Sequence, residues 1–146
     1  MKKVNYMVMV IAGLMVTVQA MAQSSNQVPS AVMEAFRTAF PTATDVEWDR
    51  EGQHYEVDFE VNRLDHEAWY NGEGKVVRHK QEMRNRDLPE QVRNGVKRNN
   101  KGYRVTDVEK LTIGNEVVYK LELMRFFRER EITVDERGET VGGFIW

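Results

Sequence analysis

The sequence predicts an α+β protein built from two tandem units, each one helix plus a four-stranded antiparallel sheet. The first observation behind this is a repeat: motifs from Tyr55 onward recur at a constant offset of 64 residues, as residues 55–59 do at 119–123. The second is helical spacing of apolar residues at the start of each repeat. The third is the alternation of apolar and polar residues that follows. A repeat of this kind predicts a binding surface rather than a catalytic pocket.

Residues 1–22 have the pattern of a secretory signal peptide. Its charged region, apolar core and cleavage site are Lys2-Lys3, residues 6–18 and Ala20-Met21-Ala22. We expect cleavage before Gln23, a flexible segment at 23–27 and no transmembrane segment in the mature chain, because the apolar run is shorter than about 20 residues. The chain has no cysteine, which excludes disulfides and an N-terminal lipidated cysteine. A periplasmic or secreted location follows.

The charge balance limits the class of partner. Without Lys2 and Lys3 the chain has 19 basic and 23 acidic residues, a formal charge near −4. This mildly acidic balance argues against nucleic acid or an anionic membrane as the main partner.

The first unit is predicted at residues 28–83. Pro29 suits a first helical turn and Pro41 ends the helix, whose apolar stripe is Val32, Ala35, Phe36, Ala39 and Phe40. A short strand at 45–49 follows. Residues 54–61 and 64–70 then alternate as strands with one buried face, and the turn at 71–74 leads into a last strand at 75–83.

The second unit is predicted at residues 88–146, after a linker at 84–87. Leu88, Val92 and Val96 form a thinner helical stripe, Gly95 weakens the helix, and residues 99–102 end it. Four strands follow, the last at 140–146 with an ambiguous register. A helix can cover only one face of each sheet, so the other face is free to bind.

The residues resemble the PepSY-like family of exported bacterial proteins, which is described as similar in fold to the beta-lactamase inhibitory protein. The motifs that carry the resemblance are Val28-Pro29, Phe40-Pro41, Val46-Glu47-Trp48, Tyr55-Glu56-Val57 and Trp69 to Gly74, and in the second unit Tyr103 to Lys110 and Val118 to Leu123. The resemblance implies a non-enzymatic envelope protein that binds or inhibits another protein, such as a peptidase or a wall enzyme. It supplies no catalytic residues.

The candidate catalytic and metal-binding residues do not form a site in this interpretation. Three histidines, His54, His66 and His79, fall on successive predicted strands, but alternation places His54 on the open face and His66 on the buried face. No zinc-type ligand spacing and no nucleophile in a catalytic context is present. We therefore predict no enzyme, no metal and no cofactor.

The open face carries recurring acidic pairs. If Asn62-Arg63 is a two-residue turn, the cross-strand pairs are Glu60 with Asp65, Asp58 with Glu67 and, by the repeat, Glu122 with Glu131. Such pairs indicate a partner with a basic surface. The alternative is a solvated face relieved by neighbouring lysine and arginine.

The offset of 64 places Phe126-Phe127 where Asn62-Arg63 stands, at a hairpin tip that usually takes Gly, Asn or Asp. Two adjacent rings cannot both point inward, so at least one is exposed or packs outside its own unit. Trp69, Phe144 and Trp146 could extend an aromatic patch. The predicted binding residues are Phe126, Phe127, Trp69, Trp146, Asp58, Glu60 and Glu67.

Two hypotheses from different classes follow. The first is a protein-binding or inhibitory module that acts through the open sheet face. The second is a binder of a small ligand or envelope polymer that uses a cleft between the repeats. A basic stretch from Arg84 to Arg104 is a solvated helix face, or a contact for an anionic wall polymer or lipid A.

Overall fold

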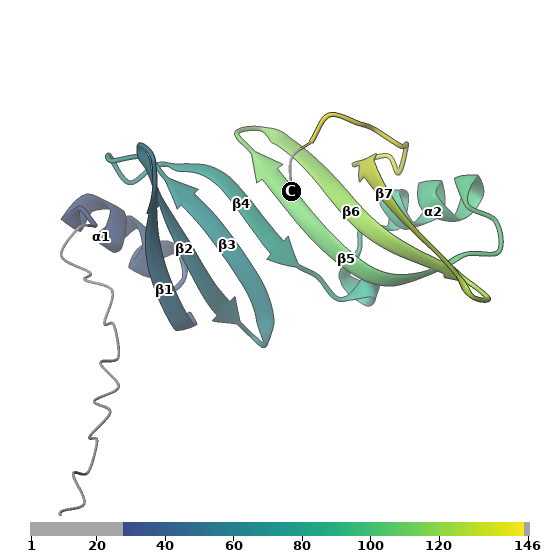
Figure 1. Cartoon of the computed structure of the whole chain (residues 1–146), viewed down its shortest axis with the longest axis horizontal. Helices are drawn as coiled ribbons and strands as arrows, with labels where there is room; N and C mark the ends of the chain where they lie inside the picture. The colour runs from purple at the N-terminus through teal and green to yellow at the C-terminus, as the bar shows by residue number, and fades with distance from the viewer. Residues whose placement is uncertain (1–27, 145–146) are drawn as a thin grey trace, which may run out of the picture.

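A computed structural model describes residues 28–144. The expected signal peptide, the segment at 23–27 and Trp146 lie outside this range. The elements are α1 (Ser30–Ala39), β1 (Thr44–Glu51), β2 (His54–Val61), β3 (Leu64–Tyr70), β4 (Val76–Glu82), η2 (Asn85–Asp87), α2 (Glu90–Asn99), β5 (Arg104–Ile113), β6 (Glu116–Arg125) and β7 (Arg128–Asp135). The strands form one antiparallel sheet in sequence order, and both helices lie behind it in Figure 1.

The N-terminal half, from α1 to β4, packs an aromatic core. Pro29 precedes α1, whose stripe buries Val32 and Phe36 against the sheet. The Phe36 ring meets Phe59 edge-on at 5.0 Å and Trp48 at 5.3 Å, the distances at which aromatic pairs stabilise beyond their buried area. The paired residues of β2 and β3 agree with the predicted register throughout, including Phe59 opposite His66.

The C-terminal half, from η2 to β7, packs a core that is aliphatic apart from Tyr119 and the adjacent Tyr103. The predicted linker contains the short η2, and α2 follows it, burying Val92 and Val96. They join a cluster on the sheet made of Val108, Tyr119, Leu121, Leu123, Ile132 and Val134. The two halves share one sheet because β4 pairs with β5, as Arg78 does with Ile113 and Lys80 with Leu111.

Glycines let each helix approach a turn of the sheet. A Cβ on Gly74 would lie 2.7 Å from the Ala31 carbonyl oxygen and 3.3 Å from the Ala35 side chain. The corresponding contact in the C-terminal half joins Gly138 to Gly95, where a Cβ on Gly95 would lie 2.3 Å from the Arg137 carbonyl oxygen. Gly95 therefore allows close packing of α2 on this turn. From the sequence alone we predicted only that it weakens the helix.

The second half departs from the predicted four strands. Within residues 28–144 it has three strands, and an isolated bridge between Val134 and Thr140 stands where the fourth was expected. The Val141 amide donates to the Thr133 carbonyl oxygen at 2.9 Å, so the ladder continues for about one residue. Gly143 has a φ of 88°, which turns the backbone out of the extended conformation that a longer strand requires.

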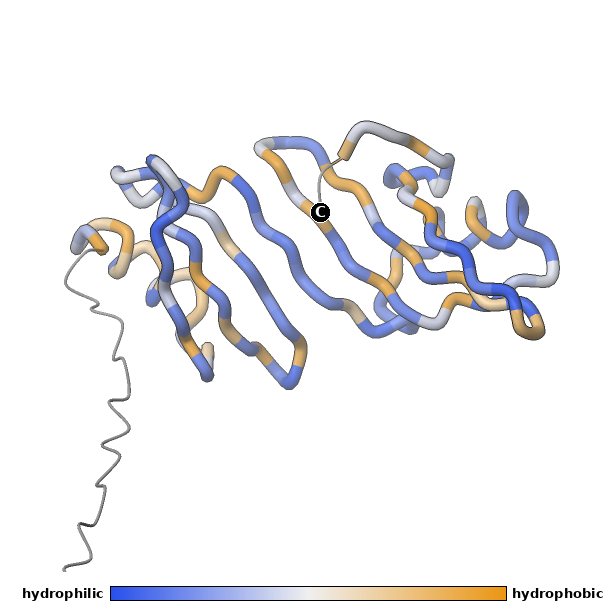
Figure 2. Tube along the Cα trace, in the orientation of Figure 1, coloured by the Kyte–Doolittle hydropathy of each residue, from blue (hydrophilic) through white to orange (hydrophobic). Residues whose placement is uncertain are grey.

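The sheet face away from the helices is largely hydrophilic. Figure 2 shows hydrophilic and hydrophobic residues alternating along the strands, with a long hydrophilic stretch on β4 at the centre of the sheet. Neither α1 nor α2 is long and apolar enough to cross a membrane, and the same holds for the remaining described residues.

Candidate binding surface

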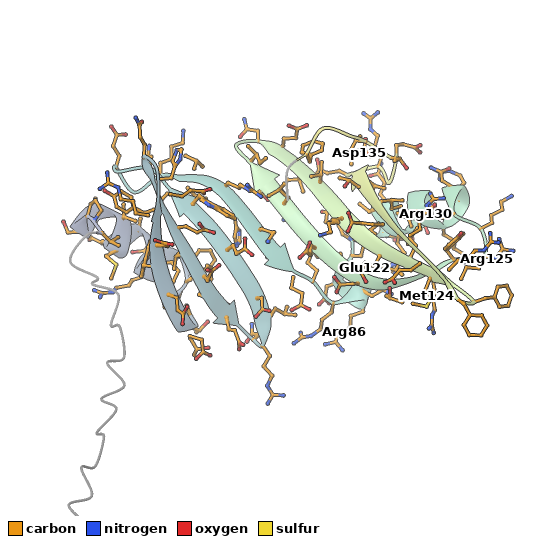
Figure 3. All side chains as sticks on the ribbon, viewed as in Figure 1. Arg86, Glu122, Met124, Arg125, Arg130 and Asp135 are labelled. Atoms are coloured by element: carbon orange, nitrogen blue, oxygen red, sulfur yellow. The ribbon has the colours of Figure 1, made fainter. Side chains whose placement is uncertain are left out.

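Cross-strand pairing gathers most of the acidic side chains on the open face. The like-charge pairs are Glu47 with Asp58, Asp49 with Glu56, Asp58 with Glu67, Glu60 with Asp65, Glu82 with Glu109, Asp107 with Glu122, and Glu122 with Glu131. We call this surface the acidic face. It spans both halves of the sheet, and Figure 3 shows Glu122 on it. The predicted pairs at Glu60, Asp58 and Glu122 have the expected partners.

Few basic side chains balance the acidic face. The register places Arg78, Lys80 and Lys120 on it, with Arg104 at the end of β5. The Lys80 ammonium lies 2.5 Å from Glu67, and Lys120 lies 2.8 Å from Glu109 and 3.7 Å from Glu131. Neighbouring cations therefore relieve the repulsion between carboxylates along the middle of the face, which is the alternative that the sequence left open. The flanks of the face remain acidic.

The carboxylates at the centre of the N-terminal half repel one another. Burial raises the pKa of Glu56, and the Asp58 carboxylate raises it further. Burial also raises the pKa of Asp58, with a second contribution from Glu67 and an opposing one from Lys80. Like charges held this closely favour any ligand that brings positive charge.

Glu56, Asp58 and Glu67 could together hold a cation. Each offers one carboxylate oxygen, and the three oxygens lie within 4.8 Å of one another. An oxygen-only set suits Ca²⁺ or Mg²⁺. The Lys80 ammonium already supplies positive charge to Glu67, so this cluster is equally suited to receiving a basic side chain of a partner.

Trp69 lies on the acidic face, as predicted, but it is only 7% exposed. Its indole N–H donates to Glu51 at 2.9 Å, and the Arg78 guanidinium covers its ring at 4.3 Å. Alternation alone could not reveal the covering arginine, which comes from β4. A partner would reach Arg78 before the ring. Trp146, the other predicted tryptophan of this patch, lies outside the described residues.

Phe126 and Phe127 form the turn between β6 and β7 and are 85% and 103% exposed. The packing of a ring against the other repeat, one alternative from the sequence, is therefore not observed. Phe126 has a φ of 55°, in the left-handed region. The equivalent turn of the N-terminal half has Asn62 and Arg63 at φ values of 55° and 63°, which suits a type I′ hairpin turn.

The histidines follow the predicted faces, and two of them meet. His54 pairs with Glu51 on the acidic face, whereas His66 and His79 lie on the helix side with 3.0 Å between Nδ1 and Nε2. Burial, with smaller contributions from His66 and Lys110, lowers the pKa of His79 to about 4. Sequence reasoning missed this pair, because it needs the register of β3 on β4, which shifts between Trp69 and Tyr70.

Two hollows lined by described residues each belong to one half of the molecule. One lies beside the β5–β6 turn and includes Ile113, Val118, Val141 and Phe144. Another lies between α1 and β1 and includes Phe36, Phe40 and Trp48. Neither is the cleft between the repeats that the ligand-binding hypothesis requires.

A family model described as "Putative beta-lactamase-inhibitor-like, PepSY-like" matches the chain over residues 14–66 and 53–141. No curated protein matches the chain.

Solved structures show the same fold. A BLIP-like protein from Bacteroides fragilis is 21% identical, with a TM-score of 0.62 over 78% of this chain and 84% of that one. A DUF2874 family protein from Bacteroides uniformis is 22% identical, with a TM-score of 0.62 over 78% and 86% of the two chains. A solved structure from Bacteroides eggerthii, described as "putative periplasmic proteins", is 18% identical, with a TM-score of 0.63 over 79% of this chain and 86% of that one.

Proposed function

The chain belongs to the PepSY-like, beta-lactamase-inhibitor-like family, and we propose that it is a non-catalytic module that binds another protein of the cell envelope through the acidic face. The partner presents a basic surface, and a peptidase or a wall enzyme is the class that the family resemblance suggests. The protein acts in the periplasm or after secretion, and the description of the Bacteroides eggerthii structure supports this location.

The observation that carries the proposal is the distribution of charge. The chain has 23 acidic and 21 basic residues, so its formal charge is only −2. The acidic residues nevertheless face one another across nearly every strand boundary of the open face. Each like-charge pair costs a few tenths of a kcal/mol in the free protein. A basic partner would relieve that repulsion and would be steered to the face over long range.

The face also has the shape of a protein-binding surface. A broad, gently twisted sheet offers area on the scale of the roughly 800 Å² per partner that stable complexes bury. The middle of the face has residues that a partner could cover and desolvate. They are Arg78, which lies over Trp69, and the half-buried Lys80 and Lys120. Arginine and aromatic side chains dominate interface energetics when they are covered in this way.

The test compares two variants of equal charge. Asp58→Asn, Glu60→Gln and Glu67→Gln together remove three negative charges from the acidic face, whereas Glu34→Gln, Glu73→Gln and Glu136→Gln remove three from exposed positions outside it. The bait is the protein recovered from periplasmic extract, with Gln23 expected as its first residue. Captured proteins are identified by mass spectrometry, and the affinity of the purified partner is then measured for each variant.

We expect the acidic-face variant to bind the partner at least about tenfold more weakly, a loss of roughly 1.4 kcal/mol. The matched control should bind like the wild type, and wild-type binding should weaken as salt rises. Equal losses in both variants would mean that net charge, not this face, drives association. Partner binding that survives the acidic-face variant would place the interface elsewhere.

A further inference from the structure

The tip of the β6–β7 hairpin is the most exposed apolar feature among the described residues. Phe126 and Phe127, here called the Phe tip, form a two-residue turn and have almost no cover from the rest of the chain. The hairpin projects from the end of the C-terminal half, beyond the labelled Arg125 in Figure 3. The N-terminal half, with the Asp58 and Glu67 carboxylates, lies at the other end of the sheet.

The Phe tip is poorly suited to its turn. Phe126 adopts a left-handed φ that Gly, Asn or Asp take with less strain, and the equivalent turn of the other half has Asn62 at its first position. Two exposed rings also contribute nothing to the core. Local strain that no packing explains is typical of positions kept for binding.

Basic side chains surround the Phe tip. Arg125 and Arg128 flank it on the two strands and line a hollow together with both rings, and Lys101 precedes Gly102 in the loop after α2. This loop lies against the hairpin, because a Cβ on Gly102 would be 3.3 Å from the Arg125 Nε. The Arg125 guanidinium also lies 5.9 Å from the rings of Tyr103 and Phe126. We call these three cations the basic collar.

The acidic balance of the chain hides this arrangement, because net charge averages two surfaces of opposite sign. The nearest acidic residue on the hairpin, Glu129, pairs with Met124 on the acidic face, whereas Arg125 pairs with Arg128 toward the helix side. The sequence argument against an anionic membrane therefore does not hold for this end of the molecule.

We propose that the Phe tip inserts into the interface of an anionic lipid bilayer, with the basic collar against the lipid phosphates. Exposed aromatic rings flanked by cations match the apolar boundary and the charged surface of such a bilayer. Two rings at the end of one hairpin offer little of the area that a stable protein complex buries, whereas insertion needs only the depth of the rings. Binding is weak and reversible, and the acidic face is repelled from the lipid and stays free for a protein.

The test is co-sedimentation of the chain from Gln23 onward with lipid vesicles. One set contains phosphatidylcholine with about a third phosphatidylglycerol, and the other contains phosphatidylcholine alone. Phe126→Asn with Phe127→Gly removes the rings without changing the charge. Arg125→Gln with Arg128→Gln removes most of the collar. In the ring-free background, Asn62→Phe with Arg63→Phe moves the rings to the other hairpin, where Val61 and Leu64 flank the turn in place of two arginines and Arg84 contacts the Asn62 carbonyl oxygen.

We expect wild-type protein to prefer anionic vesicles at least tenfold, with binding reduced by 0.5 M salt. Removing the rings should lower partition about 30-fold or more, and removing the collar should lower it about tenfold. Rings moved to the first hairpin should not restore binding. The ring-free variant should keep or raise Tm, because Asn and Gly suit the turn.

Three results would overturn the inference. The first is unchanged vesicle binding after removal of the rings. The second is equal binding to both kinds of vesicle. The third is self-association of the wild type, lost in the ring-free variant and seen in light scattering without lipid, which would make the tip a contact between copies of this chain. Partner capture by the acidic face is measured without lipid, so either proposal can fail alone.

Discussion

The two halves of the molecule share one scaffold and differ in what they do with it. In both, a helix packs on the same side of the sheet, and a small residue on the helix contacts a turn glycine, as Ala35 does with Gly74 and Gly95 with Gly138. The hairpin tips differ. One has the turn residues Asn62 and Arg63, and the other has two exposed phenylalanines. Packing therefore constrains the shared contacts, whereas the exposed hairpin tips can differ in residue type without disturbing either core.

The two halves also differ in the residue types of their cores. The N-terminal half packs Phe36, Phe40 and Phe59 around the His66–His79 pair. The C-terminal half uses aliphatic residues, and the position equivalent to His66 by the offset of 64 is Arg130, which donates to the Asn100 side-chain oxygen at 2.7 Å. We therefore expect equal sensitivity to core truncation in the two halves, but unequal sensitivity to pH.

The largest effect should come from truncating equivalent core residues. Phe59→Ala should lower the free energy of unfolding by about 3–5 kcal/mol and Leu123→Ala by about 2–5 kcal/mol, because both side chains are buried against a helix. Asp58→Ala, next to Phe59 but on the acidic face, should change it by almost nothing. Denaturant melts provide the measurement. Similar losses for Phe59→Ala and Asp58→Ala would show that the faces are wrongly assigned.

The helix–turn contacts should give the next effect. Gly138→Ala and Gly74→Ala should each cost about 2–3 kcal/mol, since both glycines have positive φ and a Cβ would meet a helix carbonyl oxygen at 2.5 and 2.7 Å. Gly95→Ala should also destabilise, although helix propensity alone predicts a gain of about 1 kcal/mol.

Gly72→Ala is the control for these three variants in thermal melts, because a Cβ there meets nothing within 4 Å. A Gly95→Ala protein that melts above the wild type would show that α2 is not held against the turn at Gly138.

The smallest effect concerns pH and separates the halves. Burial lowers the pKa of both His66 and His79, the latter to about 4, so the neutral rings are favoured in the folded state. Their contribution is fully present above the unfolded pKa of about 6.5 and is lost as pH falls toward 4. Asp65 opposes the shift at His66, and Lys110 adds to the shift at His79.

Between pH 6.5 and 4 the wild type should therefore lose about 1–2 kcal/mol relative to a His79→Gln variant. The raised pKa values of Glu56 and Asp58 act in the opposite direction, but they are present in both proteins and cancel in the difference. Hydrogen exchange at pH 5 should show faster opening of β3 and β4 than of β6. Parallel pH profiles of the two proteins would rule out the histidine pair as the cause.

Much of the scaffold was predictable because its signals are local. Pro29 and Pro41 bracket α1, and the alternation of Tyr55, Val57 and Phe59 fixes which face of β2 is buried. The Asn62-Arg63 turn then sets the register of β2 on β3, and the acidic pairs follow from it. The exposed Phe tip was accessible by the same route, since the repeat offset transfers the turn to the second hairpin.

Other features needed contacts between distant segments. Within residues 140–144 the expected strand is an isolated bridge at Thr140, because the backbone leaves the extended conformation at Gly143, and the hydrophobicity of the segment does not reveal that turn. Trp69 was placed on the correct face but not beneath Arg78, which approaches from another strand. The His66–His79 contact likewise depends on a register shift beside Trp69.

The sequence by itself determined the faces, because side-chain direction alternates along a strand and recurs along a helix whatever the rest of the chain does. The sequence thus predicted the buried face of each half, the acidic pairs and the place of Phe126-Phe127 at a hairpin tip, whereas the structure showed that both rings are exposed. Which groups meet across elements became visible only in the packed fold: Gly95 with Gly138, Arg78 over Trp69, and Arg125 beside Tyr103 and Phe126. Those contacts depend on register and close approach, which are properties of the packed chain and not of any one segment.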